Sequence, residues 1–325
     1  MDVILAGDIG GTNTRLALLA PGQGRPLFLR EYPSRAHDSL EAVLAVFLAE
    51  AGAAHPGVSP TRAGLGVAGP VTGRVATVTN LPWRVDGEAL AAKLGIPTQV
   101  MNDFSALAWA VPELTAGDLT PLGGGTPRAG AVKALIGPGT GLGMGVLVPE
   151  GPRWRALPSE GGHADFAPRN AQEARLLEFL RARHGRVSWE RVLSGRGLAN
   201  LFDFLASEPG HQENLTPLRQ AMAGEDPAAV ITRHAGDSPL CAAALELFCS
   251  LLGAAAGNLA LTVLAEGGVY VGGGIPPRIL PHLQAGFRQA FEAKGRFQGL
   301  LKEIPVYVIT HPHPGLLGAA KAALA

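Results

Sequence analysis

The sequence contains little cysteine, no excess charge of either sign and no long uninterrupted apolar run. Cys241 and Cys249 are the only two cysteines among 325 residues. Eight residues along a helix would separate their Cα atoms by ~12 Å, which is too far for a disulfide. Two cysteines by themselves also do not make a structural zinc site. We interpret both as small buried residues of a chain in a reducing compartment, and we expect a cytoplasmic location.

Charge and hydropathy exclude further classes of partner. Lys plus Arg equals Asp plus Glu, 27 against 27, so nothing favours a nucleic acid or a membrane surface. The most apolar stretch, 251–264, carries Asn258 and Thr262, and it predicts a buried helix rather than a membrane span. The chain runs from Met1 directly into a strand-like segment, and we expect no signal peptide.

The sequence is rich in glycine, with 44 residues. Its proportions of hydrophobic residues, 47%, and charged residues, 17%, are ordinary for a globular protein. The length favours two domains. Strand-like and helical segments alternate, which is typical of an α/β fold. The segment 112–130, rich in Gly, Pro and Thr, is the best linker candidate. The segment 207–235 is interrupted by Pro and Gly, and we assign it no role.

Local signals place the main elements. The helices that we expect begin near residues 39, 87, 104, 171, 198, 239, 281 and 315. Asp86 and Gly95 are typical of the two ends of one short helix. Segments 4–19 and 133–148 each predict a strand, a Gly-rich turn and a second strand.

The two strand–turn–strand segments carry similar glycine-rich turns. These turns are Asp8-Ile9-Gly10-Gly11-Thr12-Asn13-Thr14 and Gly137-Pro138-Gly139-Thr140-Gly141-Leu142-Gly143. Glycines let backbone N–H groups approach phosphate oxygens, and Thr hydroxyls add donors. Neither turn is a Walker A motif, and a strand pattern follows the second turn where a dinucleotide fingerprint requires a helix. We predict two hairpins that grip a polyphosphate, with ligand-free tight turns as the alternative.

Two further features belong to this nucleotide hypothesis. Asp8 follows a buried strand and could hold Mg²⁺ bound to the phosphates, or cap the turn by accepting from the Gly10 and Gly11 N–H groups. Gly272-Gly273-Gly274 follows a third strand. An adenosine group could pack there, since ligands bind at the carboxyl ends of α/β strands. The alternative is a turn that simply needs glycine.

Asn102 and Asp103 are the strongest chemical signal in the first half of the chain. They end an apolar strand. The carboxylate could accept a hydroxyl proton while the amide fixes a neighbouring hydroxyl. The same pair could equally be a helix N-cap.

A second polar set lies further along the chain. Glu160-Gly161-Gly162-His163 is typical of a ligand-facing loop, and Glu190 is a third acidic candidate. Glu190 could instead lie on a solvated face or pair with Arg191 or Arg186. A zinc hydrolase is disfavoured because no His-Glu-x-x-His helix is present. We interpret His311 and His313 as a turn.

Together these motifs resemble the bacterial glucokinases of the hexokinase–actin superfamily. The matching segments are Gly7-Asp8-Ile9-Gly10-Gly11-Thr12-Asn13, Gly69-Pro70-Val71, Thr79-Asn80-Leu81-Pro82-Trp83, Asn102-Asp103-Phe104, the second glycine-rich turn, the Glu160 loop through Pro168, Glu190-Arg191-Val192-Leu193-Ser194-Gly195 and Val271-Gly272-Gly273-Gly274-Ile275. They occur in the expected order over nearly the whole chain.

The resemblance implies two actin-like, ribonuclease-H-like α/β domains around a central cleft. Residues 1–111 with 311–325 would form the small domain and 112–310 the large one. The implied ATP contacts are Gly7, Asp8, Ile9, Gly10, Gly11, Thr12, Gly137, Gly139, Thr140, Gly141 and Gly273, with Mg²⁺ near Asp8. The implied glucose contacts are Asn80, Asn102, Asp103, Glu160, His163 and Glu190. A homodimer is also implied.

The expected activity is ATP-dependent phosphorylation of the glucose 6-hydroxyl to glucose 6-phosphate, the entry reaction of glycolysis, with Asp103 as the base. The related repressor and kinase family usually carries a Cys-rich zinc motif after the Glu–x–x–His segment. Here Ala164-Asp165-Phe166-Ala167-Pro168 follows instead, and no N-terminal helix-turn-helix is recognised. The alternatives are a kinase for another hexose or donor, such as polyphosphate or ADP, and a non-catalytic sugar sensor.

Overall fold

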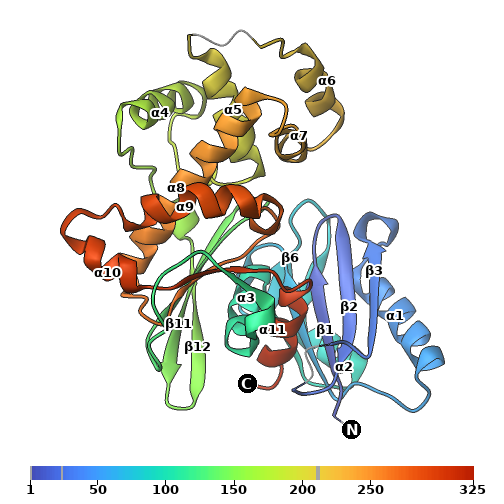
Figure 1. The fold of residues 1–325 in the computed structure, drawn as a ribbon. Helices are drawn as coiled ribbons and strands as arrows, with labels where there is room; N and C mark the ends of the chain where they lie inside the picture. Colours follow the sequence, from blue (N-terminus) through green and yellow to red (C-terminus); the bar gives the residue numbers. More distant parts are fainter. Residues whose placement is uncertain (1, 23–24, 210–212) are drawn as a thin grey trace. The chain divides into compact units, whose positions relative to one another are not determined.

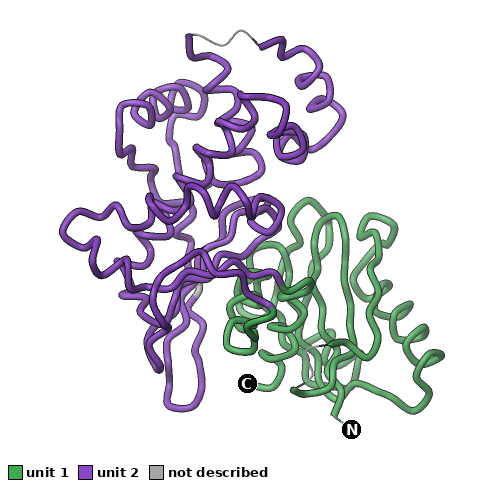
Figure 2. Tube along the Cα trace, viewed as in Figure 1, with its two compact units in different colours: residues 1–117, 311–325 green, residues 118–310 purple. Residues whose placement is uncertain are grey.

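The computed structural model describes residues 2–22, 25–209 and 213–325. The chain divides into two compact units. Unit 1 comprises residues 1–117 and 311–325, and unit 2 comprises residues 118–310 (Figure 2). Both units combine strands and helices, so the predicted α/β class is confirmed (Figure 1). The predicted division into functional domains at residue 111 stays a prediction.

Unit 1 is built on a five-stranded sheet of order β3-β2-β1-β4-β8. The strands are β1 (Ile4–Ile9), β2 (Asn13–Leu19), β3 (Phe28–Pro33), β4 (Arg62–Val67) and β8 (Thr98–Asn102). The first three pair antiparallel, and β4 and β8 continue parallel to β1. A small antiparallel sheet follows β4, with β5 (Val71–Thr72), β6 (Val75–Thr77) and β7 (Arg84–Asp86).

Alternate side chains of β1 enter two separate cores, one on each face of the sheet. Leu5 and Ile9 pack with residues of α1 and α2, whereas Ile4 and Ala6 pack with residues of α3 and α11. The helices are α1 (Leu40–Ala54), α2 (Gly87–Leu94), α3 (Asp103–Ala110) and α11 (Pro314–Ala322). The last helix of the chain therefore completes the core of unit 1.

Unit 2 repeats this strand arrangement in a six-stranded sheet of order β12-β11-β10-β13-β14-β9. The strands are β9 (Leu119–Pro121), β10 (Lys133–Pro138), β11 (Leu142–Glu150), β12 (Arg153–Ser159), β13 (Val269–Val271) and β14 (Val306–Ile309). β10, β11 and β12 pair antiparallel, and β13 and β14 continue parallel to β10. The predicted recurrence of the strand–turn–strand segment is confirmed.

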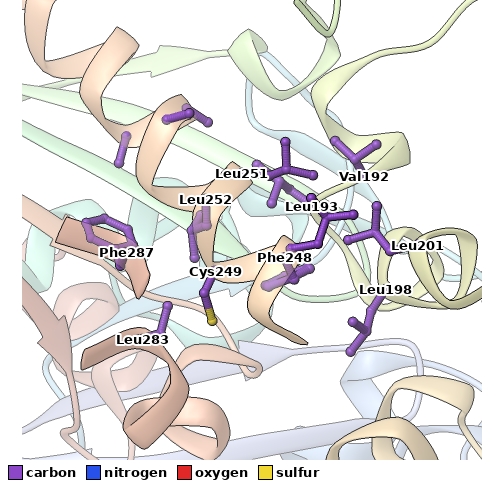
Figure 3. Packing of buried hydrophobic residues seen from close by; sticks show 14 of the residues in the cluster. Val192, Leu193, Leu198, Leu201, Phe248, Cys249, Leu251, Leu252, Leu283 and Phe287 are labelled. Carbon is purple, nitrogen blue, oxygen red and sulfur yellow. The ribbon is translucent and has the colours of Figure 1, made fainter. Parts of the chain in front are cut away.

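The core of unit 2 surrounds the long helix α8 (Pro239–Val263), which packs against α9 (Leu280–Glu292) and α5 (Gly195–Ser207). Phe248 and Cys249 lie in this core between side chains of these neighbours (Figure 3). Both cysteines are buried and free, as predicted. By length and composition α8 could cross a membrane, but 72% of its apolar window is buried inside unit 2. We interpret it as a core helix.

Two segments differ from their sequence-based interpretation. The segment without an assigned role carries α6 (Thr216–Gly224) and α7 (Pro227–Arg233), and α7 packs on α5; residues 210–212 lie outside the described chain. The linker candidate contains β9, which pairs antiparallel with β14 at the edge of the sheet. The remaining helices are α4 (Ala171–His184) and α10 (Gln298–Glu303).

Candidate active site

The first glycine-rich turn joins β1 to β2 in unit 1. The Gly10 N–H donates to the Asn13 carbonyl at 2.9 Å, which closes the turn. A Cβ at position 11 would lie 2.4 Å from the Thr79 carbonyl oxygen. Glycine is therefore required there by the close approach of the segment that follows β6.

Ser34, which the sequence analysis missed, holds this turn from the side. Its hydroxyl donates to the Gly10 carbonyl at 2.7 Å and lies 2.9 Å from the Thr14 hydroxyl. Its N–H donates to the Thr12 carbonyl at 2.8 Å. Ser34 is fully buried, so these bonds replace water and fix the turn in one conformation.

Asp8 lies in β1 directly before the turn, and its side chain is one-third exposed. Burial raises the pKa of its carboxyl, while Arg15 and His313 act in the opposite direction. The Arg15 Nη1 lies 3.6 Å from Asp8 Oδ2. The turn-capping alternative is wrong for Gly10, whose N–H bonds the Asn13 carbonyl instead. Asp8 thus presents a carboxylate beside the hairpin, the kind of oxygen ligand that Mg²⁺ prefers.

Asn102 ends β8 and is the N-cap of α3. Its Oδ1 accepts from the N–H groups of Phe104 and Ser105 at 2.9 and 3.3 Å. Its Nδ2 donates to the Gly69 carbonyl at 3.1 Å. The N-cap alternative is therefore confirmed for Asn102, and these bonds also fix the backbone that carries Asp103.

Asp103 is the first residue of α3, and its Oδ1 accepts from the Phe104 N–H at 2.8 Å. Burial is the main cause that raises the pKa of its carboxyl to about 6, and the negative charge of Asp8 acts in the same direction. Because β1 and β8 run parallel, their carboxyl ends meet at one edge of the sheet. Unit 1 thus brings Asp8 and Asp103 together.

Asn80 lies in the connection between β6 and β7. It is exposed, and its φ of 66° is in the left-handed region, which Asn tolerates better than most residues. Its Cβ would lie 3.6 Å from a Cβ built on Gly11. Unit 1 therefore places Asn80 beside the first glycine-rich turn.

The second glycine-rich turn joins β10 to β11 in unit 2. The Gly139 N–H donates to the Gly141 carbonyl at 2.8 Å. A Cβ at position 273 would lie 2.4 Å from the Pro138 carbonyl oxygen, and Gly273 has a φ of 87°. The turn after β13 therefore lies directly against the hairpin. A strand follows the turn, so the dinucleotide fingerprint is excluded, as predicted.

Glu160 directly precedes a short 3₁₀ turn, η4 (Gly161–His163), after β12, and His163 ends it. Their side chains are 93% and 56% exposed, and the Glu160 Oε2 and His163 Nε2 atoms lie 3.9 Å apart. Arg186 donates to the carbonyl oxygen of His163 and to Asp165. The arrangement presents one carboxylate and one imidazole to solvent, side by side.

Glu190 lies in a second 3₁₀ turn, η5 (Trp189–Arg191). Its Oε2 accepts from the N–H of Leu142, within the second glycine-rich turn, at 3.0 Å. Arg186 pairs with Asp165 instead. Within the described residues, Glu190 has no ion pair with Arg186 or Arg191, so that alternative is wrong. Unit 2 thus brings Glu190 to the hairpin.

The C-terminal histidines form a turn, as predicted. The His311 Nδ1 accepts from the His313 N–H at 3.1 Å, just before α11. A Cβ on Gly315, in the first turn of α11, would lie 3.5 Å from the carboxyl carbon of Asp8. Among the described residues, no three His, Cys, Asp or Glu side chains gather as a metal cluster.

Three residues beside Asp8 and its turn were not predicted as functional. They are Ser34, Arg15 and Gly315, and each lies in unit 1. Arg15 could have been found, because it is the residue opposite Asp8 in the predicted hairpin. Ser34 and Gly315 lie at least 26 residues from Asp8 in the sequence, and no local sequence pattern marks either of them.

Known glucokinases are similar to this chain over nearly its whole length. The family model described as Glucokinase matches residues 5–325. A glucokinase of Yersinia enterocolitica is 44% identical over 97% of this chain and 94% of its own length. A crystal structure of a glucokinase from an Antarctic psychrotroph has a TM-score of 0.85 and 34% identity, covering 100% of this chain and 99% of that one.

A third comparison concerns the fold alone. A Streptomyces griseus glucokinase of the ROK family, solved with glucose and AMPPNP, has a TM-score of 0.68 at 22% identity and covers 99% of both chains. The fold is the predicted actin-like α/β fold. With a matching family model and a relative of high coverage, the chain belongs to the glucokinase family, whose reaction is the ATP-dependent phosphorylation of glucose.

Proposed function

We propose that this chain transfers the γ-phosphoryl group of ATP to the 6-hydroxyl of glucose, with Asp103 as the general base. The observation that carries this proposal is the carboxyl of Asp103, whose pKa burial raises to about 6 beside a second carboxylate, Asp8. A base of this strength is deprotonated at neutral pH and accepts a proton more readily than an ordinary carboxylate. Its backbone is fixed by the cap that Asn102 forms.

The proton and phosphoryl steps balance without a further reactant. The 6-hydroxyl oxygen forms a bond to the γ-phosphorus as the bond to the β,γ-bridging oxygen breaks, and ADP leaves with that electron pair. The hydroxyl proton passes to the Asp103 carboxylate and is released to solvent afterwards. Positioning and neutralisation of the phosphate charge supply most of the rate enhancement in reactions of this class.

Asp8 is the residue that would hold Mg²⁺. Its partly exposed carboxylate fits this ion, because Mg²⁺ is usually held by one or two carboxylates together with waters and substrate phosphates. When bound, Mg²⁺ would neutralise phosphate charge. The absence of a three-residue metal cluster among the described residues is compatible with such a site, which requires few protein ligands.

The proposed ATP contacts lie on the two glycine-rich hairpins. We propose that the backbone of Gly7, Asp8, Ile9, Gly10, Gly11 and Thr12 and that of Gly137, Gly139, Thr140 and Gly141 approach the phosphates. Gly273, packed against the Pro138 carbonyl, would line the adenosine. A Cβ on Gly139 would meet only the Gly274 nitrogen, at 3.9 Å, so space for a ligand remains above it.

The proposed glucose contacts are the six residues that the family resemblance implies. Asn80, Asn102 and Asp103, all of unit 1, would contribute. Glu160, His163 and Glu190 would contribute from unit 2. The exposure of Glu160 and His163 supports this proposal, since their polar atoms are available to sugar hydroxyls.

The proposal extends to location, domains and assembly. We propose a cytoplasmic enzyme, supported by two buried free cysteines. We also propose a small domain of residues 1–111 with 311–325, a large domain of residues 112–310, and a homodimer. Sedimentation velocity with purified protein tests the assembly, where one species at twice the chain mass is expected and a species at 33.5 kDa would contradict it.

A coupled assay of glucose 6-phosphate formation tests the activity with glucose, and consumption of the phosphoryl donor measures the activity with other hexoses. Purified protein is supplied with Mg²⁺, each of ATP, ADP or polyphosphate, and a panel of hexoses. The expected result is that ATP with glucose gives the highest kcat/KM. A higher value for another pair would reassign the donor or the sugar, and glucose binding without consumption of any donor would indicate a sensor.

A further inference from the structure

The segment that carries Glu190 is bonded to the second glycine-rich turn at two points. Glu190 Oε2 accepts from the Leu142 N–H at 3.0 Å, where β11 begins. The Gly195 N–H donates to the Gly139 carbonyl at 2.8 Å, where β10 has just ended. The two bonds lie at opposite ends of the turn, which we call the 139–142 turn. The segment 190–195 therefore spans the whole turn.

Gly141 lies between these two points and is also in contact with the segment 190–195. It is not among the glycines with a positive φ, so its backbone conformation does not require glycine. A Cβ at position 141 would, however, lie 2.5 Å from Glu190 Oε2 and 3.4 Å from its carboxyl carbon. A side chain at position 141 would therefore displace the carboxylate of Glu190, which lies against the turn.

The loop that carries His163 meets the same residue of the turn. A Cβ on Gly162, the middle residue of η4, would lie 2.0 Å from the Leu142 carbonyl oxygen. Leu142 is itself buried. The N–H of Leu142 thus contacts one proposed sugar ligand, and its carbonyl contacts the loop that carries two others.

The segment 190–195 is anchored in the core of unit 2 and by a hydrogen bond within the segment. Val192 and Leu193 are fully buried in the core of unit 2, in the same cluster as Phe248 (Figure 3). The Ser194 hydroxyl donates to the Glu190 carbonyl at 2.8 Å. Because its backbone is anchored in this way, the Glu190 carboxylate can fix the position of the turn rather than follow it.

We propose that Glu190 positions the 139–142 turn for ATP, and that glucose binding to the same carboxylate strengthens ATP binding. This inference rests on the proposed function. Glu190 Oε2 bonds the turn, and Oε1 has no hydrogen bond within the described residues. A sugar hydroxyl on Oε1 would fix the side-chain torsions of Glu190. The turn would then be ordered before ATP arrives, so ATP would lose less conformational freedom on binding.

This arrangement predicts a coupling between two ligands, and such a coupling is reciprocal. Glucose should tighten the binding of ATP, and ATP should tighten the binding of glucose by the same factor. If Glu190 served only as a sugar ligand, its removal would weaken glucose binding. Its removal would not change the affinity for ATP once the variant was saturated with glucose.

Titration calorimetry with a non-hydrolysable ATP analogue, with and without saturating glucose, tests the proposal. In the unmodified protein glucose should lower the Kd of the analogue. In Glu190→Ala the Kd of the analogue at saturating glucose should rise roughly tenfold or more, because one charge-assisted hydrogen bond is lost. The effect of glucose on this Kd should also disappear. Glu190→Gln should recover most of the analogue affinity, since its amide oxygen can still accept from Leu142.

His163→Ala is the matched control. It removes a proposed sugar contact that makes no side-chain bond to the turn, so glucose should bind more weakly while the analogue Kd at saturating glucose stays near normal. Unmodified analogue affinity and an intact glucose effect in Glu190→Ala would overturn the proposal. Failure of the proposed function would show differently, as an absence of ATP-dependent glucose phosphorylation in the unmodified protein.

Discussion

Asp103 owes its chemistry to its place at the junction of a strand and a helix. The junction buries the carboxyl, and burial raises its pKa to about 6 because the charged form loses hydration. Asn102, one residue earlier, caps the helix and keeps the backbone of the junction fixed. A carboxyl in this position changes its protonation state within the pH range in which the enzyme can be assayed.

The pH dependence of kcat/KM should report this group. The base acts only when it is deprotonated, so activity should be full above pH 7 and should fall tenfold per pH unit well below about 6. The measurement is kcat/KM for glucose from pH 5 to pH 8, with circular dichroism at each pH to show that the protein stays folded. A profile that remains flat down to pH 5 would contradict the assignment.

At the scale of elements, each glycine-rich hairpin depends on a support from outside it. Ser34 bonds the first turn through its hydroxyl and its N–H. Glu190 and Gly195 bond the second turn. The hairpins supply the backbone groups for phosphates, but these distant residues fix the shape in which those groups are presented.

Replacement of Ser34 by Ala should therefore weaken both stability and ATP binding. The change leaves the partly buried Gly10 carbonyl and the buried Thr14 hydroxyl without their hydroxyl partner, which costs about 1–3 kcal/mol. The matched control is Ser39→Ala, which removes the N-cap of α1 and should cost about 1 kcal/mol. Thermal unfolding should show a loss in both variants, whereas the KM for ATP should rise only in Ser34→Ala. An equal KM in both variants would argue against a role for Ser34 in the hairpin.

Elements with strong local signals were predicted from the sequence. Asp86 accepts from the N–H groups of Glu88 and Ala89, and Gly95 ends α2 in the left-handed conformation. The two hairpins were predicted because glycine turns between apolar strands are local patterns. Asp8 and Asp103 were each assigned to the end of a strand, but their proximity was not predicted, because it depends on the parallel pairing of β1, β4 and β8.

Elements and contacts that depend on distant partners were not predicted. β9 has three residues and forms only because β14 offers it an edge, some 190 residues later. The bond from Leu142 to Glu190 joins residues 48 positions apart. Such pairings depend on tertiary packing, which local propensity does not encode.

At the scale of the whole molecule, the end of the chain completes the unit that its beginning forms. α11 packs on α3 and on β1. A Cβ on Gly318 would lie 1.7 Å from the Ala106 carbonyl oxygen and 2.7 Å from the Ala110 nitrogen. The two helix backbones therefore touch at a position where no side chain fits.

Gly318→Ala should destabilise the protein by at least about 2 kcal/mol, because α3 and α11 must separate. The matched control is Gly52→Ala, in α1, where a Cβ meets nothing within 4 Å. That change should stabilise by about 0.5–1 kcal/mol, since alanine loses less backbone entropy in a helix. Thermal unfolding of the two variants should shift in opposite directions. A rise in Tm for Gly318→Ala would show that the helices do not pack this closely.

The most direct test of the central claim is the turnover of Asp103→Asn. The asparagine oxygen can still accept from the Phe104 N–H, so the fold and measurable glucose binding should persist. Without a base, kcat for glucose 6-phosphate formation should fall by roughly 10²–10⁴-fold. Glucose binding with this loss of kcat is the predicted result, and a kcat close to that of the unmodified protein would contradict the account.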